Sequence, residues 1–406
     1  MIQSTIALNE AKPLPDGWRW VRLGEVCEFL DHLRIPVNDV DRHLRTAGKK
    51  QSELYPYYGA NGQVDWIDDY LFDEELVLLA EDGGFFGSFD RPVAYKVSGK
   101  CWVNNHAHVL RAKKELVDVD WLHFSVAIRP DIIRFVSGTT RPKLTQDQAA
   151  LVPIPLPPLP EQKRIAAKVQ ELMKEIERAR RACEARLEAA KALPQAHLRQ
   201  VFESEEAKKW ERKKLGELFD VQQGVAMSPY RREGVAPRPF LRTLNVLWGR
   251  VDLSTLDKMD FTDGEVSRLS LKLGDLLVCE GGEVGRTAIW RGELDTCLYQ
   301  NHIHRLRKIN GTVVSEFYMY WMQAAFQVFK SYSGEESATT IPNLSENRLK
   351  TFLFPFPPAR VQARIATELQ AKMEESEKLA ASIEKQLETI KALPQAILRK
   401  AFRGEL

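Results

Sequence analysis

A long segment occurs twice in this chain, at positions that differ by 200 residues. The first copy runs from PIPLPPLPEQKRIAAKV to KALPQAHLRQVF, and the second from FPFPPARVQARIATEL to KALPQAILRKAF. Residues 192–202 and 392–402 are identical at eight of eleven positions, and residues 161–177 and 361–377 at eight of seventeen. This agreement indicates an internal duplication, so we expect the same structural unit to occur twice.

Each copy has the apolar spacing of a coiled-coil helix, with steps of four and three residues and with Glu, Lys and Arg on the other faces. The first seam comprises Ile165, Val169, Leu172, Ile176, Ala179, Cys183, Leu187 and Ala190, and the second Ile365, Leu369, Met373, Leu379, Ile383, Leu387 and Ile390. Pro194 and Pro394 are predicted to end or kink the helices, which leaves rods of roughly 33 residues and about 50 Å. A long helix packed on a single domain is the alternative for one copy, whereas two matching copies favour mutual pairing.

The duplication extends beyond the helices. WRWVRLGEVCEF opens one globular unit and WERKKLGELFDV the other, and CWVNNHAHVLR matches CLYQNHIHRLR. Short aromatic and aliphatic runs between Gly and Asp turns predict strands. We therefore predict an α+β fold with two mixed-sheet units. The predicted boundaries are a flexible terminus (1–12), a first globular unit (13–156), a helical spacer (157–205), a second globular unit (206–356) and a C-terminal helical spacer (357–406).

The composition describes a soluble globular protein that is too long for one core, with 44% hydrophobic and 28% charged residues. A formal charge of +2 means that any nucleic-acid surface must be a local basic patch. The first ten residues, MIQSTIALNE, lack a basic region followed by a long apolar run, no eighteen apolar residues run together, and the five cysteines are scattered. We therefore expect a cytoplasmic protein with reduced thiols and no membrane partner.

Common catalytic signatures are missing from the sequence, including the phosphate-binding loop, G-x-S-x-G, H-E-x-x-H and the Asn-Pro-Pro-aromatic stretch of adenine methyltransferases. Two H-x-H sequences, His106/His108 and His302/His304, are metal candidates because alternate residues of a strand share a face. A core-strand pattern inherited by both units is the favoured interpretation, since no further ligand lies at metal spacing.

Basic residues flank segments rich in Asn, Thr, Tyr and Gln. They cluster at Lys49/Lys50, at residues 208–214, at Arg231/Arg232 and around Arg141/Lys143. Asn, Gln and Thr side chains can hydrogen-bond base edges while Arg and Lys bind phosphates. YPYYGANG at residues 55–62 has no match in the second unit, where RTLNVLWGRVDL follows from Arg242. Two similar scaffolds with different loops are predicted to bind two different targets.

The duplicated PxPPLPEQKRIA…KALPQAxLR organisation, together with SGTTRPKL, YPYYGANG and NNHAHVL, resembles the specificity subunit of a type I restriction–modification system. The resemblance covers essentially the whole chain. It implies two target recognition domains that each read one half of a split, asymmetric DNA site, and two antiparallel helices that separate them and dock the methyltransferase subunits. The second copy departs from the pattern because Val361 replaces the Glu of the Leu-x-Glu-Gln motif, so docking there is expected to differ in detail.

The resemblance further implies a non-catalytic subunit with pseudo-two-fold circular arrangement, which positions two adenine-N6 methyltransferase subunits and the restriction subunits on double-stranded DNA. S-adenosylmethionine, ATP and Mg would be bound by those partner subunits, and this chain itself is expected to bind no cofactor. A 50 Å spacer corresponds to about one and a half turns of B-DNA. By loop position and residue type, the candidate DNA contacts are Tyr57, Tyr58, Asn61, Thr140, Arg141, Lys143, Arg231, Arg242, Asn245, Thr340 and Asn343. The candidate coiled-coil and partner contacts are Ile165, Val169, Leu172, Ile176, Leu187, Ile365, Leu369, Met373, Ile383 and Leu387.

Two other functions fit parts of the sequence. A coiled-coil scaffold could bind proteins through its two globular units, and it would not need a basic surface on both. A metal-dependent hydrolase could use the H-x-H strands, and it would be purified with bound metal.

Overall fold

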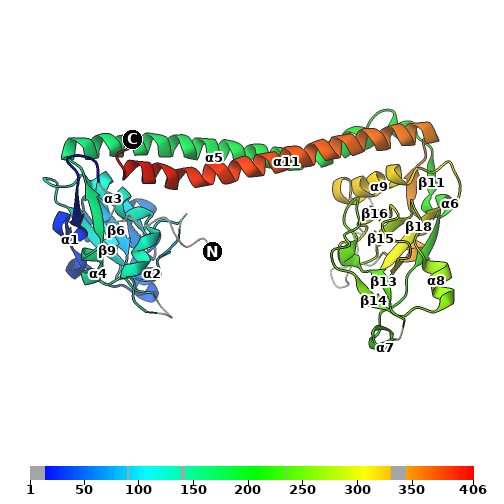
Figure 1. Ribbon diagram of the computed structural model, residues 1–406, viewed down its shortest axis with the longest axis horizontal. Helices are drawn as coiled ribbons and strands as arrows, with labels where there is room; N and C mark the ends of the chain where they lie inside the picture. Colours follow the sequence, from blue (N-terminus) through cyan, green and yellow to red (C-terminus); the bar gives the residue numbers. More distant parts are fainter. Residues whose placement is uncertain (1–13, 89–90, 139–141, 235, 331–343) are drawn as a thin grey trace. The chain divides into compact units, whose positions relative to one another are not determined.

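The computed structural model describes residues 14–88, 91–138, 142–234, 236–330 and 344–406. The chain divides into two compact units, one formed by residues 1–184 with 385–406 and the other by residues 185–384. Two long helices, α5 (Leu159–Phe202) and α11 (Ala359–Ala401), each contribute to both units (Figure 1). Among the described helices, none combines the length and apolar character needed to cross a bilayer.

The first unit contains two four-stranded sheets and a two-stranded ribbon, ordered β2-β9-β6-β7, β4-β3-β8-β5 and β1-β10. Its strands are β1 (Arg19–Arg22), β2 (Cys27–Phe29), β3 (Tyr55–Gly59), β4 (Gly62–Ile67), β5 (Phe72–Asp73), β6 (Leu76–Ala80), β7 (Ala94–Val97), β8 (Lys100–Val103), β9 (Ala107–Ala112) and β10 (Pro153–Leu156). Its shorter helices are α1 (Leu23–Val26), η1 (Asp31–Leu33), α2 (Asp39–Thr46), η2 (Gln51–Glu53), α3 (Val119–Ala127), η3 (Pro130–Phe135) and α4 (Gln146–Ala150).

The second unit repeats this plan with sheets ordered β12-β18-β15-β16, β14-β13-β17 and β11-β19. Its strands are β11 (Arg212–Lys214), β12 (Phe219–Gln223), β13 (Arg238–Leu241), β14 (Asp257–Met259), β15 (Leu276–Cys279), β16 (Thr287–Ile289), β17 (Leu298–Tyr299), β18 (Ile303–Lys308) and β19 (Leu353–Pro355). Its shorter helices are η4 (Ala207–Lys209), α6 (Leu215–Leu218), α7 (Pro229–Arg232), η5 (Thr243–Asn245), α8 (Asp263–Leu269), α9 (Ser315–Gln323), the π-helical η6 (Ala324–Val328) and α10 (Glu346–Lys350).

The strand pairing confirms that the fold is an α+β fold used twice. β3 pairs in parallel with β8, and β13 pairs in parallel with β17, in sheets that are otherwise antiparallel. β13 is therefore the structural counterpart of β3, although the YPYYGANG sequence of residues 55–62 has no match in the second unit. The two strands differ in sequence, while their backbone pairing is the same.

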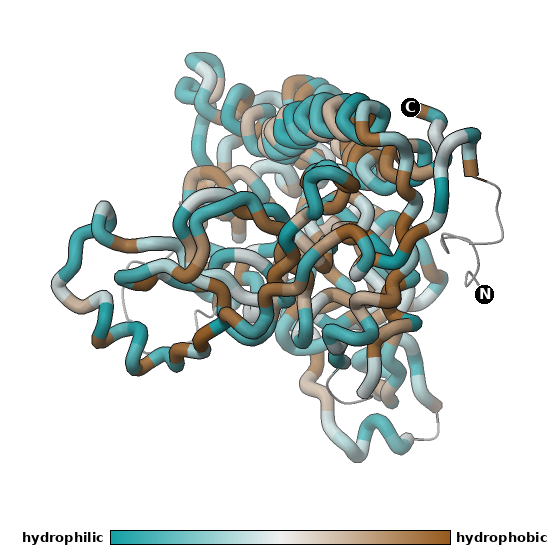
Figure 2. Tube along the Cα trace, turned by 90° about the vertical axis from the view of Figure 1, so that its left-hand side faces the viewer, coloured by the Kyte–Doolittle hydropathy of each residue, from teal (hydrophilic) through white to brown (hydrophobic). Residues whose placement is uncertain are grey.

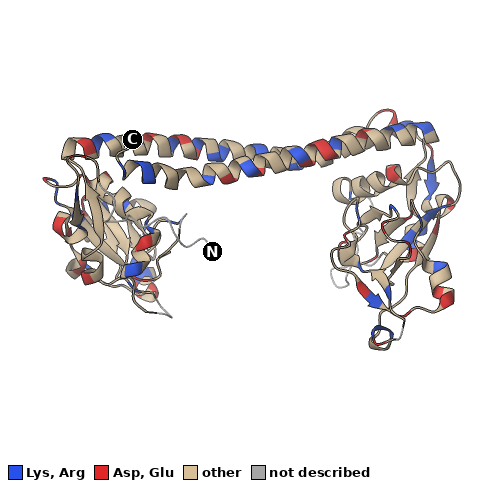
Figure 3. Cartoon of the chain, in the orientation of Figure 1, with Lys and Arg blue, Asp and Glu red and all other residues tan. Residues whose placement is uncertain are grey.

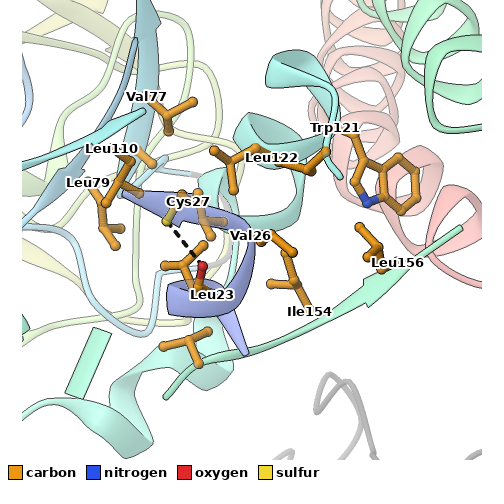
Figure 4. Close-up of a cluster of buried hydrophobic side chains, with 14 of the residues drawn as sticks. Leu23, Val26, Cys27, Val77, Leu79, Leu110, Trp121, Leu122, Ile154 and Leu156 are labelled. Carbon is orange, nitrogen blue, oxygen red and sulfur yellow. Dashed lines mark hydrogen bonds between the residues drawn. The ribbon is translucent and has the colours of Figure 1, made fainter. Parts of the chain in front are cut away.

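The core of the first unit lies between the β2-β9-β6-β7 sheet, α3 and the β1-β10 ribbon (Figure 4). Leu23, Leu79, Leu110 and Trp121 are fully buried there, and Cys27 Sγ lies 3.1 Å from the Leu23 carbonyl oxygen. Burial raises the pKa of the Cys27 thiol to about 12, so this cysteine is an apolar core residue and not a nucleophile. The cluster also includes Leu398 and Phe402 near the end of α11.

The second unit has two clusters that correspond to its two larger sheets. The larger cluster gathers the aromatic face of α9 with Leu198 and Phe202 of α5 and with Ile365 and Leu369 of α11. Thus in each unit the beginning of one long helix packs with the end of the other, as antiparallel pairing requires.

A buried glutamine ties the start of each long helix to its globular unit. Gln162 accepts a hydrogen bond from the Asp118 N–H and donates to the carbonyls of Leu116 and Pro157. Gln362 makes the same three bonds, with the Val314 N–H and the carbonyls of Thr312 and Pro357. These bonds fill three of the four hydrogen-bonding positions of each amide.

Pro194 and Pro394 do not end the long helices, so that part of the prediction is wrong. Both prolines lie inside their helices, since α5 continues to Phe202 and α11 to Ala401. An interior proline costs about 3 kcal/mol in a helix. Two fully buried apolar side chains contribute roughly 1.5–3 kcal/mol each, and the last turn of α5 buries Leu198 and Phe202. Tertiary packing of the last turns therefore outweighs the local preference of proline.

The seam of the long helices differs from the predicted one at two positions. Leu379 is 40% exposed and Ala179 is also exposed, while Ser376 is buried and Ala380 half-buried. Steps of three and four are kept along α11 when Ser376 and Ala380 replace Leu379.

Figure 2 shows hydrophilic and hydrophobic residues mixed along these helices, and Figure 3 shows both signs of charge on their surfaces. Lys191 and Glu384 form an ion pair between α5 and α11 at 3.1 Å.

Candidate nucleic-acid interface

In the first unit, two candidate DNA contacts meet the same short segment, which follows β6. Asn61 occupies the turn between β3 and β4, and its Nδ2 donates to the Gly83 carbonyl at 2.9 Å. Lys143 forms a backbone bridge with Asp82, and its Nζ lies 2.9 Å from Glu81 Oε1. The structure thus brings Asn61 and Lys143 to one edge of the unit, where both side chains are exposed. Thr140 and Arg141 lie outside the described residues.

The two tyrosines of this region have different environments. Tyr57 is buried, its hydroxyl donates to the Val37 carbonyl at 3.1 Å, and the Arg42 guanidinium covers its ring. Tyr58 is half-buried against Tyr95, and burial raises the pKa of its hydroxyl. Tyr57 therefore shapes the core beneath the edge, and any DNA contact by its side chain would require it to leave that core.

A network of charged residues supports this edge. Arg34 Nη1 donates to Glu81 Oε2 at 2.7 Å, and its Nη2 lies 3.4 Å from Asp31 Oδ2. Burial opposes ionisation of Glu81, but hydrogen bonds from Arg34 and Lys143 lower its pKa below the ordinary value. Glu81 therefore holds Lys143 as a charged partner.

The first H-x-H sequence borders this network, but its two histidines do not share a strand face. His106 precedes β9 and is partly exposed, with Nδ1 2.7 Å from Asp82 Oδ1, whereas His108 lies within β9 and is buried. Within the described part of the chain, Asp31, Glu81 and His108 are the one group with potential metal-ligand spacing. Arg34 and Lys143 form ion pairs with these carboxylates, so their negative charge is already balanced without a metal ion.

In the second unit, the predicted contacts have mainly structural partners. Arg231 forms a two-point ion pair with Glu265, at 2.9 and 2.8 Å, and its guanidinium lowers the pKa of Glu265 to about 2. Arg242 Nε lies 3.1 Å from Asp257. Asn245 is fully buried, where it accepts from the Arg242 N–H and donates to the carbonyls of Asp252 and Thr255. Thr340 and Asn343 lie outside the described residues.

Two exposed or partly exposed side chains of the second unit were missed by sequence reasoning, whereas a third, His302, was named there only as a metal candidate. Tyr230 at α7 is 89% exposed, and Trp248 Nε1 donates to Glu283 at 2.5 Å. His302 lies 3.6 Å from Glu280 and occupies the position that His106 has in the first unit. The exposure of Tyr230 and Trp248 depends on tertiary structure, so no local sequence pattern could have revealed it.

The predicted coiled-coil residues lie on the inner side of the long helices. Ile165, Val169, Leu187, Ile365, Leu369, Ile383 and Leu387 are buried. Leu172, Ile176 and Met373 are half-buried. Most of the surface of these side chains is buried within the chain. A contact between any of them and a partner protein stays a prediction.

Comparisons with known proteins agree with this duplicated architecture. A family model for the type I restriction modification DNA specificity domain matches residues 15–183 and 207–389. A protein of Haemophilus influenzae named as a type I restriction enzyme specificity subunit is 36% identical over 146 residues, which span 36% of this chain and 35% of that protein. The EcoKI specificity subunit of Escherichia coli is 24% identical over 98% of this chain and 90% of its own length. The crystal structure of the HsdS subunit from Thermoanaerobacter tengcongensis has a TM-score of 0.63 and 23% identity, covering 98% of this chain and 99% of that one.

Proposed function

Since the chain belongs to the type I restriction–modification DNA specificity family, we propose that each of its globular units reads one half of a bipartite, asymmetric DNA site. One observation carries this proposal. The two units repeat the same strand pairing, yet the connection that follows the parallel strand carries Asn61 in the first unit and Trp248 in the second. Different side chains on one frame select different bases.

The long helices suit the partner-binding role of such a subunit. Their inner faces are used within the chain, while their outer faces carry exposed Glu, Lys and Arg. We propose that two methyltransferase subunits, and with them restriction subunits, dock there in the cytoplasm. Catalysis would belong to those partners, which would bind S-adenosylmethionine, ATP and Mg, and this chain would be non-catalytic.

The substitution of Val361 for Glu should matter little to the fold. Glu161 is partly exposed and pairs with Arg164 at 3.5 Å, while the adjacent Gln162 and Gln362 make the structural bonds. At this end Val361 packs against the core of the second unit and presents no charge, so a difference in docking would come from the lost carboxylate and from the apolar side chain that replaces it.

The test is co-expression with a neighbouring methyltransferase gene, followed by single-molecule sequencing of host DNA for N6-methyladenine. The wild-type complex should methylate a split motif with one adenine on each strand. Asn61→Ala should relax the first half-site and Trp248→Ala the second, each by about 1–3 kcal/mol of discrimination, because a base-edge or groove contact is lost. Lys114→Ala, at an exposed lysine of the first unit, is the matched control and should leave the motif unchanged.

A stable complex that methylates no split motif would contradict the proposal and favour the scaffold function. Relaxation of the same half-site by both Asn61→Ala and Trp248→Ala would contradict the assignment of one half-site to each unit.

A further inference from the structure

In each unit a loop follows the central strand, β6 or β15, and we call residues 81–87 and 280–286 the glycine loops. The first residue of each loop is a glutamate whose N–H donates to the histidine carbonyl just before β9 or β18. The third residue is Gly83 or Gly282, with φ angles of 65° and 76°, where a residue with a Cβ atom would be strained. The two glycine loops therefore share one backbone frame.

A hairpin tip is bonded to the glycine loop in each unit. Asn61 lies in the turn between β3 and β4, and its Nδ2 donates to the Gly83 carbonyl at 2.9 Å. Trp248 lies at the tip of a short hairpin between β13 and β14, and its Nε1 donates to Glu283 Oε1 at 2.5 Å. Each tip is thus held against the glycine loop of its own unit by the side chain that is the candidate DNA contact.

Further bonds hold the hairpin tip of the second unit. The Gly249 N–H donates to the carbonyl of the first residue of β16 at 2.9 Å. Arg286 Nη2 donates to the Thr243 carbonyl at 2.6 Å, and Arg286 Nη1 lies 3.2 Å from Glu283 Oε2. The Trp248 ring is therefore held at its Nε1 edge, and the backbone on both sides of it is bonded to the same neighbouring strand and loop.

In the first unit, Tyr95 of β7 holds the tip in another way. Its hydroxyl donates to the carbonyls of Gly59 and Gly62, which lie on either side of the turn that carries Asn61. The register of β7 on β6 and of β16 on β15 places Ala288 at the equivalent position of the second unit. The two units therefore use different residues to hold their tips in place.

The bond to the glycine loop determines which polar groups of Asn61 remain for DNA. A backbone carbonyl only accepts, so Nδ2 faces Gly83 and Oδ1 faces away from it. One N–H of the amide and the Oδ1 acceptor remain on an exposed side chain. A donor next to an acceptor matches N7 and the N6 amino group of adenine in the major groove. The arrangement therefore favours adenine.

Trp248 is left with a different chemistry. An indole ring has one polar group, the Nε1–H donor, and Glu283 accepts from it. The carboxylate of Glu283 is in turn balanced by Arg286. The rest of the half-buried ring is apolar, and apolar groups in the major groove contact the C5 methyl group of thymine. The second tip therefore favours thymine, without a hydrogen bond to the base.

We propose that the glycine loops orient the reading side chains, so that Asn61 reads an adenine of the first half-site and Trp248 reads the methyl group of a thymine of the second. Tyr95 and Glu283 are positioning residues, because they hold the tips and do not touch the bases. This inference rests on the proposed function and names the base chemistry at one position of each half-site.

The test measures the affinity of the specificity–methyltransferase complex for duplexes that carry its split motif with one base altered at a time. 7-Deazaadenine lacks the N7 acceptor of adenine, and uracil lacks the methyl group of thymine, while both keep their base pairing. The wild type should lose about threefold to tenfold in affinity at one adenine of the first half-site, as the loss of one hydrogen bond implies. It should lose about fourfold at one thymine of the second, as the loss of one methyl group implies.

Two variants assign these effects to single side chains. Asn61→Ala should bind adenine and 7-deazaadenine duplexes equally well, and Trp248→Ala should bind thymine and uracil duplexes equally well, because the contact that distinguishes them is gone. Base effects that persist at full size in these variants would overturn the base assignment.

Substitutions of Glu283 test the positioning of Trp248. Its side chain is 51% exposed, so its removal should leave the fold intact. Glu283→Ala frees the ring and should abolish the difference between thymine and uracil, while the first half-site is read as before. Glu283→Gln keeps an acceptor for Nε1 and should retain the difference. Glu293→Ala, at an exposed glutamate that accepts from the Arg291 N–H, is the matched control and should change nothing.

Tyr95→Phe is the corresponding variant of the first unit. It removes only the hydroxyl that bonds to the turn, so it should reduce the difference between adenine and 7-deazaadenine and leave the second half-site unaffected. A full thymine–uracil difference in Glu283→Ala, or no altered adenine or thymine that weakens wild-type binding, would overturn this inference alone. A complex that reads no split motif would overturn the proposed function instead.

Discussion

At the scale of single residues, burial decides which polar side chains build the fold and which face a ligand. Tyr57 and Asn245 have the chemistry of base contacts, yet both are buried and hydrogen-bonded to backbone carbonyls. Gln162 and Gln362 show the same effect in the duplicated helices, since each saturates backbone groups of its own unit. Because Gln362 makes the structural hydrogen bonds at the start of α11, the neighbouring position can hold Val361 in place of Glu.

Replacement of Gln162 by Met should therefore destabilise the first unit. It leaves the Asp118 N–H and two carbonyls without partners, which we expect to cost about 2–4 kcal/mol in the free energy of unfolding. Glu161→Val, which copies the second repeat, is the matched control and should change stability by less than about 0.5 kcal/mol. Urea denaturation of the full chain measures both, and equal losses would show that the glutamine has no special structural role.

At the scale of elements, the long helices are determined more by tertiary packing than by local preference. α5 and α11 pass through Pro194 and Pro394 because their last turns bury Leu198, Phe202, Leu398 and Ala401. The seam follows steps of three and four through Ser376, although Leu379 is the more apolar residue. A continuous register outweighs the hydrophobicity of one side chain.

Pro194→Ala should stabilise α5. It restores a helical hydrogen bond and removes a clash with the preceding turn, for a gain of about 1–3 kcal/mol after the entropy lost from the unfolded proline is counted. Thermal unfolding followed by circular dichroism would report the gain. Ala189→Pro, at an exposed position of the same helix, is the opposite control and should lower the midpoint. If Pro194→Ala lowers it too, the proline has a specific packing role.

At the scale of the whole molecule, one fold occurs twice with different surfaces. β9 and β18 pair with β6 and β15 in the same register, so that Leu110 and Leu306 occupy equivalent buried positions. Each residue belongs to a hydrophobic cluster of its own unit. A duplicated frame with separate cores allows the recognition surface of one unit to change without unfolding the other.

Leu110→Ala and Leu306→Ala form a matched pair that tests the separate cores. Each should cost about 2–5 kcal/mol because it opens a cavity in a fully packed core. Calorimetry of the full chain should show two unfolding components, with each substitution lowering a different one. A single component that both substitutions lower equally would mean that the two cores unfold as one cooperative unit.

The sequence by itself determined the duplication, the α+β class, the two long helices and the family, because each leaves a periodic or repeated pattern along the chain. It also indicated Asn61 and Lys143, which the structure brings to one edge. Only tertiary structure decided that Tyr57 and Asn245 are buried, that the helices continue through their prolines, and that His108 lies beside the Asp31 carboxylate. The physical reason is the same in each case: burial, packing and charge depend on residues that are distant in the sequence, and no local pattern records which of them become neighbours.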